Sequence, residues 1–100
     1  SSRAPLDGLA VKFDKVLRET KVEVPTSQSA LIQRIVKLRR ELSMAVFKHD
    51  DDKLDFALQL LASGVGASEF KATVGDDIFT IIMADDCHLR YLKELSILQQ

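Results

Sequence analysis

Residues 27–49, "SQSALIQRIVKLRRELSMAVFKH", carry the strongest helical pattern of the sequence. The apolar residues of this stretch recur at alternating spacings of four and three, which is the period of one face of an α-helix. One line of them comprises Leu31, Ile35, Leu38, Leu42 and Ala45. A second line beside it comprises Ile32, Val36, Val46 and Phe47. The stretch therefore predicts a helix of about five to six turns, with an apolar face wide enough for a core.

The second apolar line allows two interpretations. A helix at the edge of a small bundle buries one stripe of roughly 100° and leaves the rest in solvent. Two stripes indicate either a central helix covered on both sides or an exposed patch that binds a partner. In the second case we expect Ile32 and Val36 to contact an amphipathic partner helix or a second copy of the domain. Arg34, Arg39 and Arg40 would then form the polar rim of that contact.

Helical patterns lie on both sides of this stretch. Residues 4–20 carry apolar residues at helical spacing, with Pro5 at the first helical position, where its missing N–H costs nothing. Residues 21–27 interrupt the pattern, because Val24 precedes Pro25 and is disfavoured in the helical region. Thr26 or Ser27 can then cap the next helix.

The second half of the chain also favours helices. Leu54, Ala57, Leu58 and Leu61 make a stripe that ends at Gly64, which suits a Schellman-type stop. Residues 65–74 predict a short helix capped by Ser68, and the alternative is a β-hairpin over 70–83, where β-branched and aromatic residues dominate. After Gly75, with Asp76 or Asp77 as cap, residues 76–98 form one helix or two. The apolar side of the last helix comprises Leu89, Leu92 and Leu95, with Tyr91 and Leu98 beside them.

Two acidic clusters, "KHDDDKLDF" (48–56) and "ADDCHLRYL" (84–92), contain residues that bind metals in other proteins. We interpret both as helix boundaries. Asp51 or Asp52 would cap one helix, and Asp85 or Asp86 another. Lys48 and His49 would lie in the last turn of the preceding helix, where positive charge is favoured.

Neither cluster predicts a catalytic or metal site. Consecutive carboxylates diverge, and no zinc or calcium motif is present, so we expect no metal and no cofactor. Cys87 and His88 are adjacent and would point apart on a helix, although a nucleophilic pair needs hydrogen-bond contact. A small buried cysteine is therefore expected. Glycine-rich phosphate loops are also missing, so we expect that the protein is not an enzyme.

Length and composition bound the architecture. One hundred residues with 46% hydrophobic content suit a single domain over 1–100. We predict an all-α, compact bundle of four to five helices, with a short helix or a short hairpin near 68–80. The chain lacks an initiator methionine, which suggests excision from a longer protein. A single cysteine favours a reducing intracellular location, cytoplasmic or nuclear, and no apolar run is long enough for a membrane span.

Charge is distributed unevenly along the chain. Residues 1–48 hold ten Lys/Arg and five Asp/Glu, whereas residues 49–100 hold four and ten, so the halves carry +5 and −6. Such asymmetry either marks an interaction surface or is neutralised where the halves meet. Arg34, Lys37, Arg39 and Arg40 form the best nucleic-acid candidate, but the pI of about 6.1 is far below the value above 9 of typical nucleic-acid binders.

These features favour one function and leave a second open. We expect a protein–protein interaction or assembly module of a larger intracellular protein, which binds a protein partner or a second copy through an apolar helix face. Ile32 and Val36, with Arg34, Lys37, Arg39 and Arg40, are the expected contact residues. The alternative is a nucleic-acid-associated helical domain that uses the four basic residues.

Overall fold

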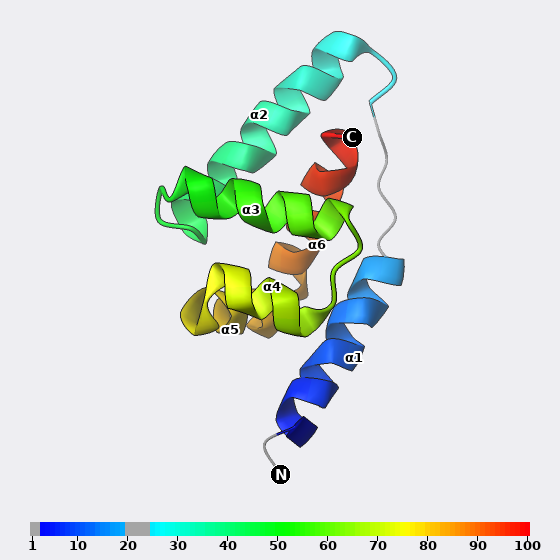
Figure 1. The fold of residues 1–100 in the computed structure, drawn as a ribbon. Coiled ribbons are helices and arrows are strands. Elements are labelled where there is room, and N and C mark those ends of the chain that lie inside the picture. Colours follow the sequence, from blue (N-terminus) through cyan, green and yellow to red (C-terminus); the bar gives the residue numbers. More distant parts are fainter. Residues whose placement is uncertain (1–2, 20–24) are drawn as a thin grey trace.

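The structure, a computed structural model, describes residues 3–19 and 25–100, and these form six α-helices without a strand (Figure 1). The helices are α1 (Arg3–Glu19), α2 (Gln28–Ala45), α3 (Asp51–Ala62), α4 (Ala67–Val74), α5 (Asp76–Ala84) and α6 (Asp86–Leu98). The all-α prediction is confirmed. The predicted number of helices, four to five, is too low because residues 67–98 form three separate helices.

The hairpin alternative for residues 70–83 is wrong. Gly75, with φ of 88°, separates α4 from α5 and turns the chain between them. Phe70, Val74, Phe79 and Ile82 are buried, so the aromatic and β-branched residues that suggested strands pack as helix faces. Here tertiary packing overrides local β-propensity.

The central helix of the fold is α6. It packs against α1, α2, α3 and α5, and Figure 1 shows it running behind α3. Leu89, Leu92 and Leu95 are completely buried, as the spacing predicts, whereas Tyr91 remains 40% exposed. In contrast, α2 packs only against α3 and α6 among the described helices, so it lies at the edge.

Contacts between three aromatic rings pack α1 against α4 and α5. The ring centroids of Phe13 and Phe70 are 5.2 Å apart, and those of Phe70 and Phe79 are 6.2 Å apart. All three side chains are buried, and they come from α1, α4 and α5. These tilted ring contacts fall within the favourable range for aromatic pairs.

The turn after α3 has the predicted Schellman geometry. Gly64 has φ of 77°, the left-handed region that glycine adopts without steric cost. The N–H of Val65 donates to the carbonyl of Leu60, and that of Gly64 donates to Leu61, each at 3.2 Å. These bonds satisfy carbonyls that would otherwise be unpaired at the helix end.

Side-chain caps begin α2, α3 and α6. Ser27 caps α2 by accepting from the N–H of Ala30 at 3.2 Å, and Asp85 caps α6 by accepting from the N–H of Cys87 at 2.8 Å. For α3 the predicted cap, Asp51 or Asp52, is wrong. Asp50 accepts from the N–H of Lys53 at 3.0 Å.

Four other local predictions also differ from the structure. Gly66 and Gly75 precede α4 and α5 without a side-chain cap, so Ser68, Asp76 and Asp77 lie inside the first turns instead. The helix α1 begins at Arg3, so Pro5 is in its first turn but not at its first position. Cys87 is exposed in the first turn of α6 because the buried side of that helix begins only at Leu89.

Ion pairs join the basic first half of the chain to the acidic second half. Lys12 contacts Asp86 at 3.2 Å, Arg39 contacts Asp55 at 2.6 Å, and Arg34 pairs with Glu94. Charge asymmetry along the sequence is thus partly neutralised where the halves meet. Within the residues that the structure describes, no helix combines the length and apolar character needed to cross a bilayer.

Candidate protein interaction surface

The two apolar lines of α2 meet different environments. On one side of the helix, Leu38 and Leu42 are buried, and Leu31 and Ile35 are partly buried against the same core. On the other side, Ile32 and Val36 are 53% and 50% exposed. Because α2 packs only against α3 and α6 among the described helices, the central-helix interpretation does not hold for this element.

Four residues at intervals of four form an exposed row along α2, here named the α2 row: Ile32, Val36, Arg40 and Met44. Met44 is 57% exposed. At a rise of 1.5 Å per residue the row is about 18 Å long. Among the described side chains, α2 carries three exposed large apolar ones, Ile32, Val36 and Met44, which is more than any other helix carries.

Sequence reasoning assigned the wrong residues to the end of this line. Val46 and Phe47 were expected beside Ile32 and Val36, but α2 ends at Ala45 and both residues turn into the core. Met44 was missed, although it follows Val36 by eight residues and so shares its face of the helix. The spacing alone could have identified it.

The loop between α2 and α3 places His49 near the Met44 end of the α2 row. Lys48 and His49 have φ of 51° and 68°, so they lie in a left-handed turn and not in the last turn of α2 as predicted. The N–H of His49 donates to the carbonyl of Ser43 at 2.7 Å, and the Ser43 hydroxyl donates to Asp51 at 2.6 Å. This second bond holds Asp51 against α2 and leaves Asp50 to cap α3.

Two hollows flank α2. The first, the α2–α3 hollow, has a volume of about 380 Å³ and is lined by Val36, Arg39, Arg40, Ser43, Met44, His49 and Asp51. The second, the α2–α6 hollow, has a volume of about 430 Å³ and is lined by Ala30, Gln33, Arg34, Lys37, Leu38, Glu41 and Tyr91. The helix is therefore a ridge with open space on both sides.

The four basic residues of the expected site do not act as one cluster. Arg34 pairs with Glu94 on α6, and Arg39 pairs with Asp55 on α3, so these two point toward opposite neighbours of α2. Within the described residues, Lys37 and Arg40 have no carboxylate partner. The phosphates of a nucleic acid would therefore meet two cations that are already paired, Arg34 and Arg39, on different sides of the helix. Of the four, only Lys37 and Arg40 have no carboxylate partner within the described residues.

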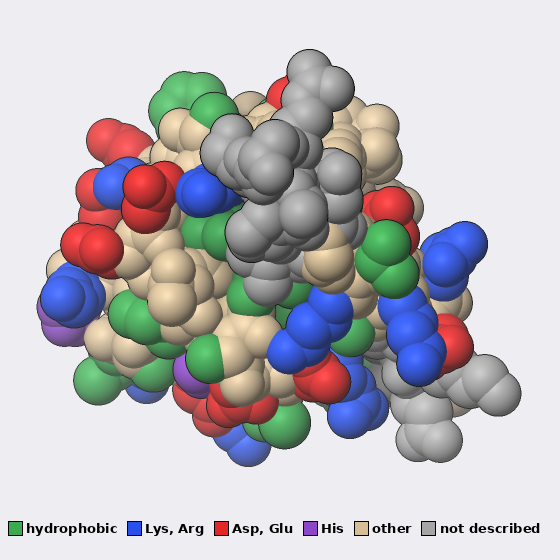
Figure 2. All heavy atoms as spheres, turned by 90° about the horizontal axis from the view of Figure 1, so that it is seen from below, with side chains coloured by type: hydrophobic (Ala, Val, Ile, Leu, Met, Phe, Trp, Pro, Cys, Tyr) green, Lys and Arg blue, Asp and Glu red, His purple; other side chains and the backbone are tan. Residues whose placement is uncertain are grey.

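Other exposed apolar side chains are dispersed. Val11, Phe56, Ile81 and Tyr91 are each exposed on a different helix. Seen from below, the visible face carries hydrophobic side chains in separate places among charged ones (Figure 2). Scattered single side chains of this kind are normal on a protein surface.

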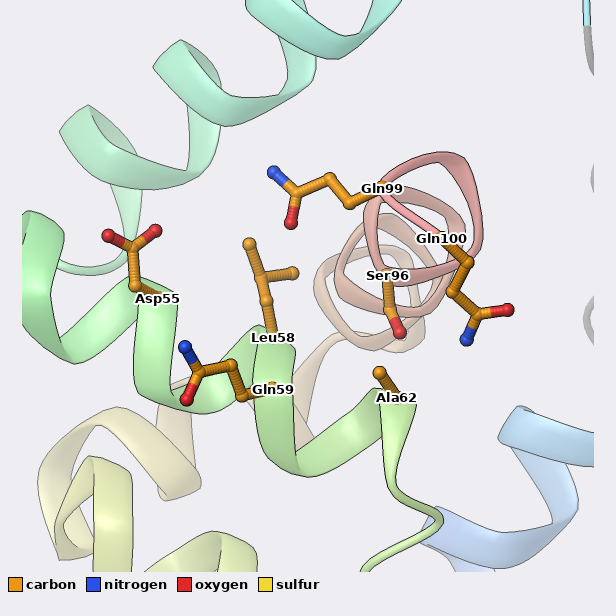
Figure 3. Close-up of a pocket in the computed structure, with 7 residues that line it drawn as sticks. All are labelled: Asp55, Leu58, Gln59, Ala62, Ser96, Gln99 and Gln100. Atoms are coloured by element: carbon orange, nitrogen blue, oxygen red, sulfur yellow. The ribbon is translucent and has the colours of Figure 1, made fainter.

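A smaller hollow of about 240 Å³ lies between α3 and α6 (Figure 3). Its walls carry mainly amide and apolar groups, from Gln59, Gln99, Gln100 and Leu58 among others. In Figure 3 the Ser96 side chain points from α6 toward Ala62 on α3. The Ser96 hydroxyl is buried and has no hydrogen-bond partner among the described residues.

In the second acidic cluster, residues 84–92, Asp85 is in contact with groups of helix α6. Backbone N–H donation from Cys87 holds the pKa of Asp85 below its ordinary value, and a positive charge on nearby His88 acts in the same direction. His88 Nε2 lies 3.7 Å from Asp85, and its Nδ1 lies 3.4 Å from the carbonyl of Ile81. Over residues 3–19 and 25–100, no three His, Cys, Asp or Glu side chains gather in a way that could hold a metal ion.

Comparisons of the chain with protein-family models, with curated proteins and with solved structures gave no match in any of the three.

Proposed function

We propose that this domain is a protein–protein interaction or assembly module that binds its partner through the exposed side of α2. The observation that carries the proposal is the exposure of Ile32, Val36 and Met44 along one side of a helix whose other side is anchored in the core. An amphipathic helix normally exposes polar residues on its solvent side. A row of large apolar side chains there is the usual mark of a contact surface.

The small apolar area of the α2 row indicates that it would supply only part of an interface. Burying the exposed half of each apolar side chain contributes about 1 kcal/mol, since full burial contributes about 1.5–3 kcal/mol. A stable complex buries roughly 800 Å² on each partner. The row would therefore be the apolar centre of a larger contact that includes the walls of the two flanking hollows.

Site-specific photo-crosslinking tests this proposal. A photoreactive amino acid is introduced at Val36 in one variant and at Val11, which is 67% exposed on α1, in a matched control. Both positions are solvent-accessible, so random encounters label them equally. We expect an adduct with a second copy or with another protein from position 36, and much less from position 11.

The proposal would be contradicted by equal labelling from both positions, or by the absence of any adduct from position 36 in purified protein and in extract alike. A strong adduct from position 11 alone would assign the contact surface to α1 instead.

A further inference from the structure

The cations near the α2 row differ in whether they are already neutralised. Arg39 contacts Asp55 at 2.6 Å and Arg34 pairs with Glu94, so both have partners inside the domain. Arg40 and Lys37 are exposed and have no carboxylate partner within the described residues. Arg40 also stands in the α2 row itself, between Val36 and Met44. An exposed arginine without a carboxylate partner among the described residues is therefore flanked, one turn away on each side, by exposed apolar side chains.

The α2–α3 hollow places this guanidinium at a site with room for another side chain. Val36 and Met44 supply its apolar walls, and Arg40 and His49 supply groups that donate hydrogen bonds. Its acidic member, Asp51, already accepts a hydrogen bond from Ser43 at 2.6 Å. A carboxylate that enters beside Arg40 would find a planar donor suited to bidentate binding.

Resting on the function proposed above, we infer that the partner is an acidic amphipathic helix that lies along the α2 row. Its apolar residues, spaced three and four apart, contact Ile32, Val36 and Met44, and its carboxylates face Arg40 and Lys37. Charge complementarity of this kind selects partners and orients them at the interface.

The shape of the surface favours a helix over other binding segments. Side chains four residues apart make a ridge, and ridges of this type pack into the grooves of another helix at interaxial distances of about 8–10 Å. The hollows on both sides of α2 leave room for the side chains of that helix. A peptide that binds as an added β-strand needs an open strand edge, and the described residues form no strand.

Two synthetic helical peptides test the inference against the full chain. Both are about five turns long and carry the same leucines at helical spacing. One has glutamates at the flanking positions and the other has lysines. We expect the acidic peptide to bind about tenfold more tightly at low salt, with an advantage that shrinks as salt is added.

Variants of the domain test whether the preference for the acidic peptide arises at the α2 row. Arg40→Glu should reverse it, so that the lysine peptide binds better. Arg90→Glu makes the same charge change at an exposed position on α6 and should leave the preference unchanged. Val36→Ser should weaken the binding of both peptides.

Equal affinity for the two peptides, or a preference that survives Arg40→Glu, would overturn the inference of an acidic partner. If Val36→Ser still weakened both peptides, the proposed function of the α2 surface would stand. Binding of neither peptide, together with self-association that Val36→Ser abolishes, would identify the occupant as a second copy and would also overturn this inference.

Discussion

At the scale of single residues, two valines of one sequence stretch meet opposite environments, one on α2 and one just beyond its end. Val36 is half exposed, whereas Val46 is completely buried, and both belong to one apolar line in the sequence. The spacing predicts which residues share a face, because that follows from 3.6 residues per turn. It does not predict which of two adjacent faces meets α6. That outcome depends on contacts with residues about 50 positions away.

Two buried serines should respond to alanine substitution with opposite signs. The Ser96 hydroxyl lacks a hydrogen-bond partner among the described residues, so Ser96→Ala removes an unsatisfied buried group and should stabilise the fold by about 1 kcal/mol. The Ser43 hydroxyl donates to Asp51, so Ser43→Ala should destabilise it by about 1 kcal/mol. Urea unfolding measures both changes. A loss of stability in Ser96→Ala comparable to that in Ser43→Ala would show that Ser96 has a partner.

Asp85 should contribute to the pH dependence of stability. Its pKa is lowered in the folded protein, chiefly by the N–H of Cys87, relative to an unfolded value of about 3.9. A lowered folded pKa stabilises the fold above the unfolded pKa, and this contribution is lost as pH falls through the folded pKa. We therefore expect the stability difference between the wild type and Asp85→Asn to be constant above pH of about 5 and to shrink in more acidic solution. Urea unfolding at several pH values checks this, and a difference that stays constant down to the acid limit would exclude the contribution.

At the scale of elements, sequence reasoning located helices better than their ends. The long helix predicted within residues 27–49 is confirmed as far as Ala45, and so are one of its two candidate caps, Ser27, and the stop at Gly64. Each of these follows from a local rule that involves a few neighbouring residues. The cap of α3 was misassigned among three consecutive aspartates. The choice depends on the Ser43–Asp51 hydrogen bond, which joins residues eight positions apart across a left-handed turn.

The corrected cap gives a direct test. Asp50→Ala removes the acceptor for the N–H of Lys53 and should destabilise the protein by about 0.5–2 kcal/mol. Asp52→Ala removes only a first-turn charge, so the expected loss is about 0.3–1 kcal/mol at low salt and less at high salt. Thermal unfolding of the two variants provides the comparison, and a larger loss in Asp52→Ala would restore the sequence prediction. Since we interpret these carboxylates as groups that stabilise the start of α3 and not as metal ligands, a chelator should leave the unfolding temperature unchanged.

At the scale of the whole molecule, the class of fold was predictable but the arrangement was not. Periodicity indicated helices throughout, yet it did not show that the last helix would be central. That position follows from the breadth of the buried side of α6, which includes Ser96 as well as Leu89, Leu92 and Leu95. Because α6 is central, α2 packs against α6 and α3 with one side only. The other side of α2 is left in solvent. The exposed row is therefore a consequence of the packing of the whole chain.

The helix α2 packs into the core with one side, and we propose that it binds a partner with the other. The most direct measurement is sedimentation velocity combined with urea unfolding on the double variant Ile32→Ser/Val36→Ser. Serine has a helix propensity close to that of isoleucine and valine, so the substitution changes the surface and not the helix. We expect a loss of stability of no more than about 2 kcal/mol, because about half of each side chain is already exposed. We also expect the loss of self-association or of binding to a partner protein. Unfolding of the double variant, with a wild-type protein that is monomeric at every concentration and binds no partner, would show that these residues serve only the core.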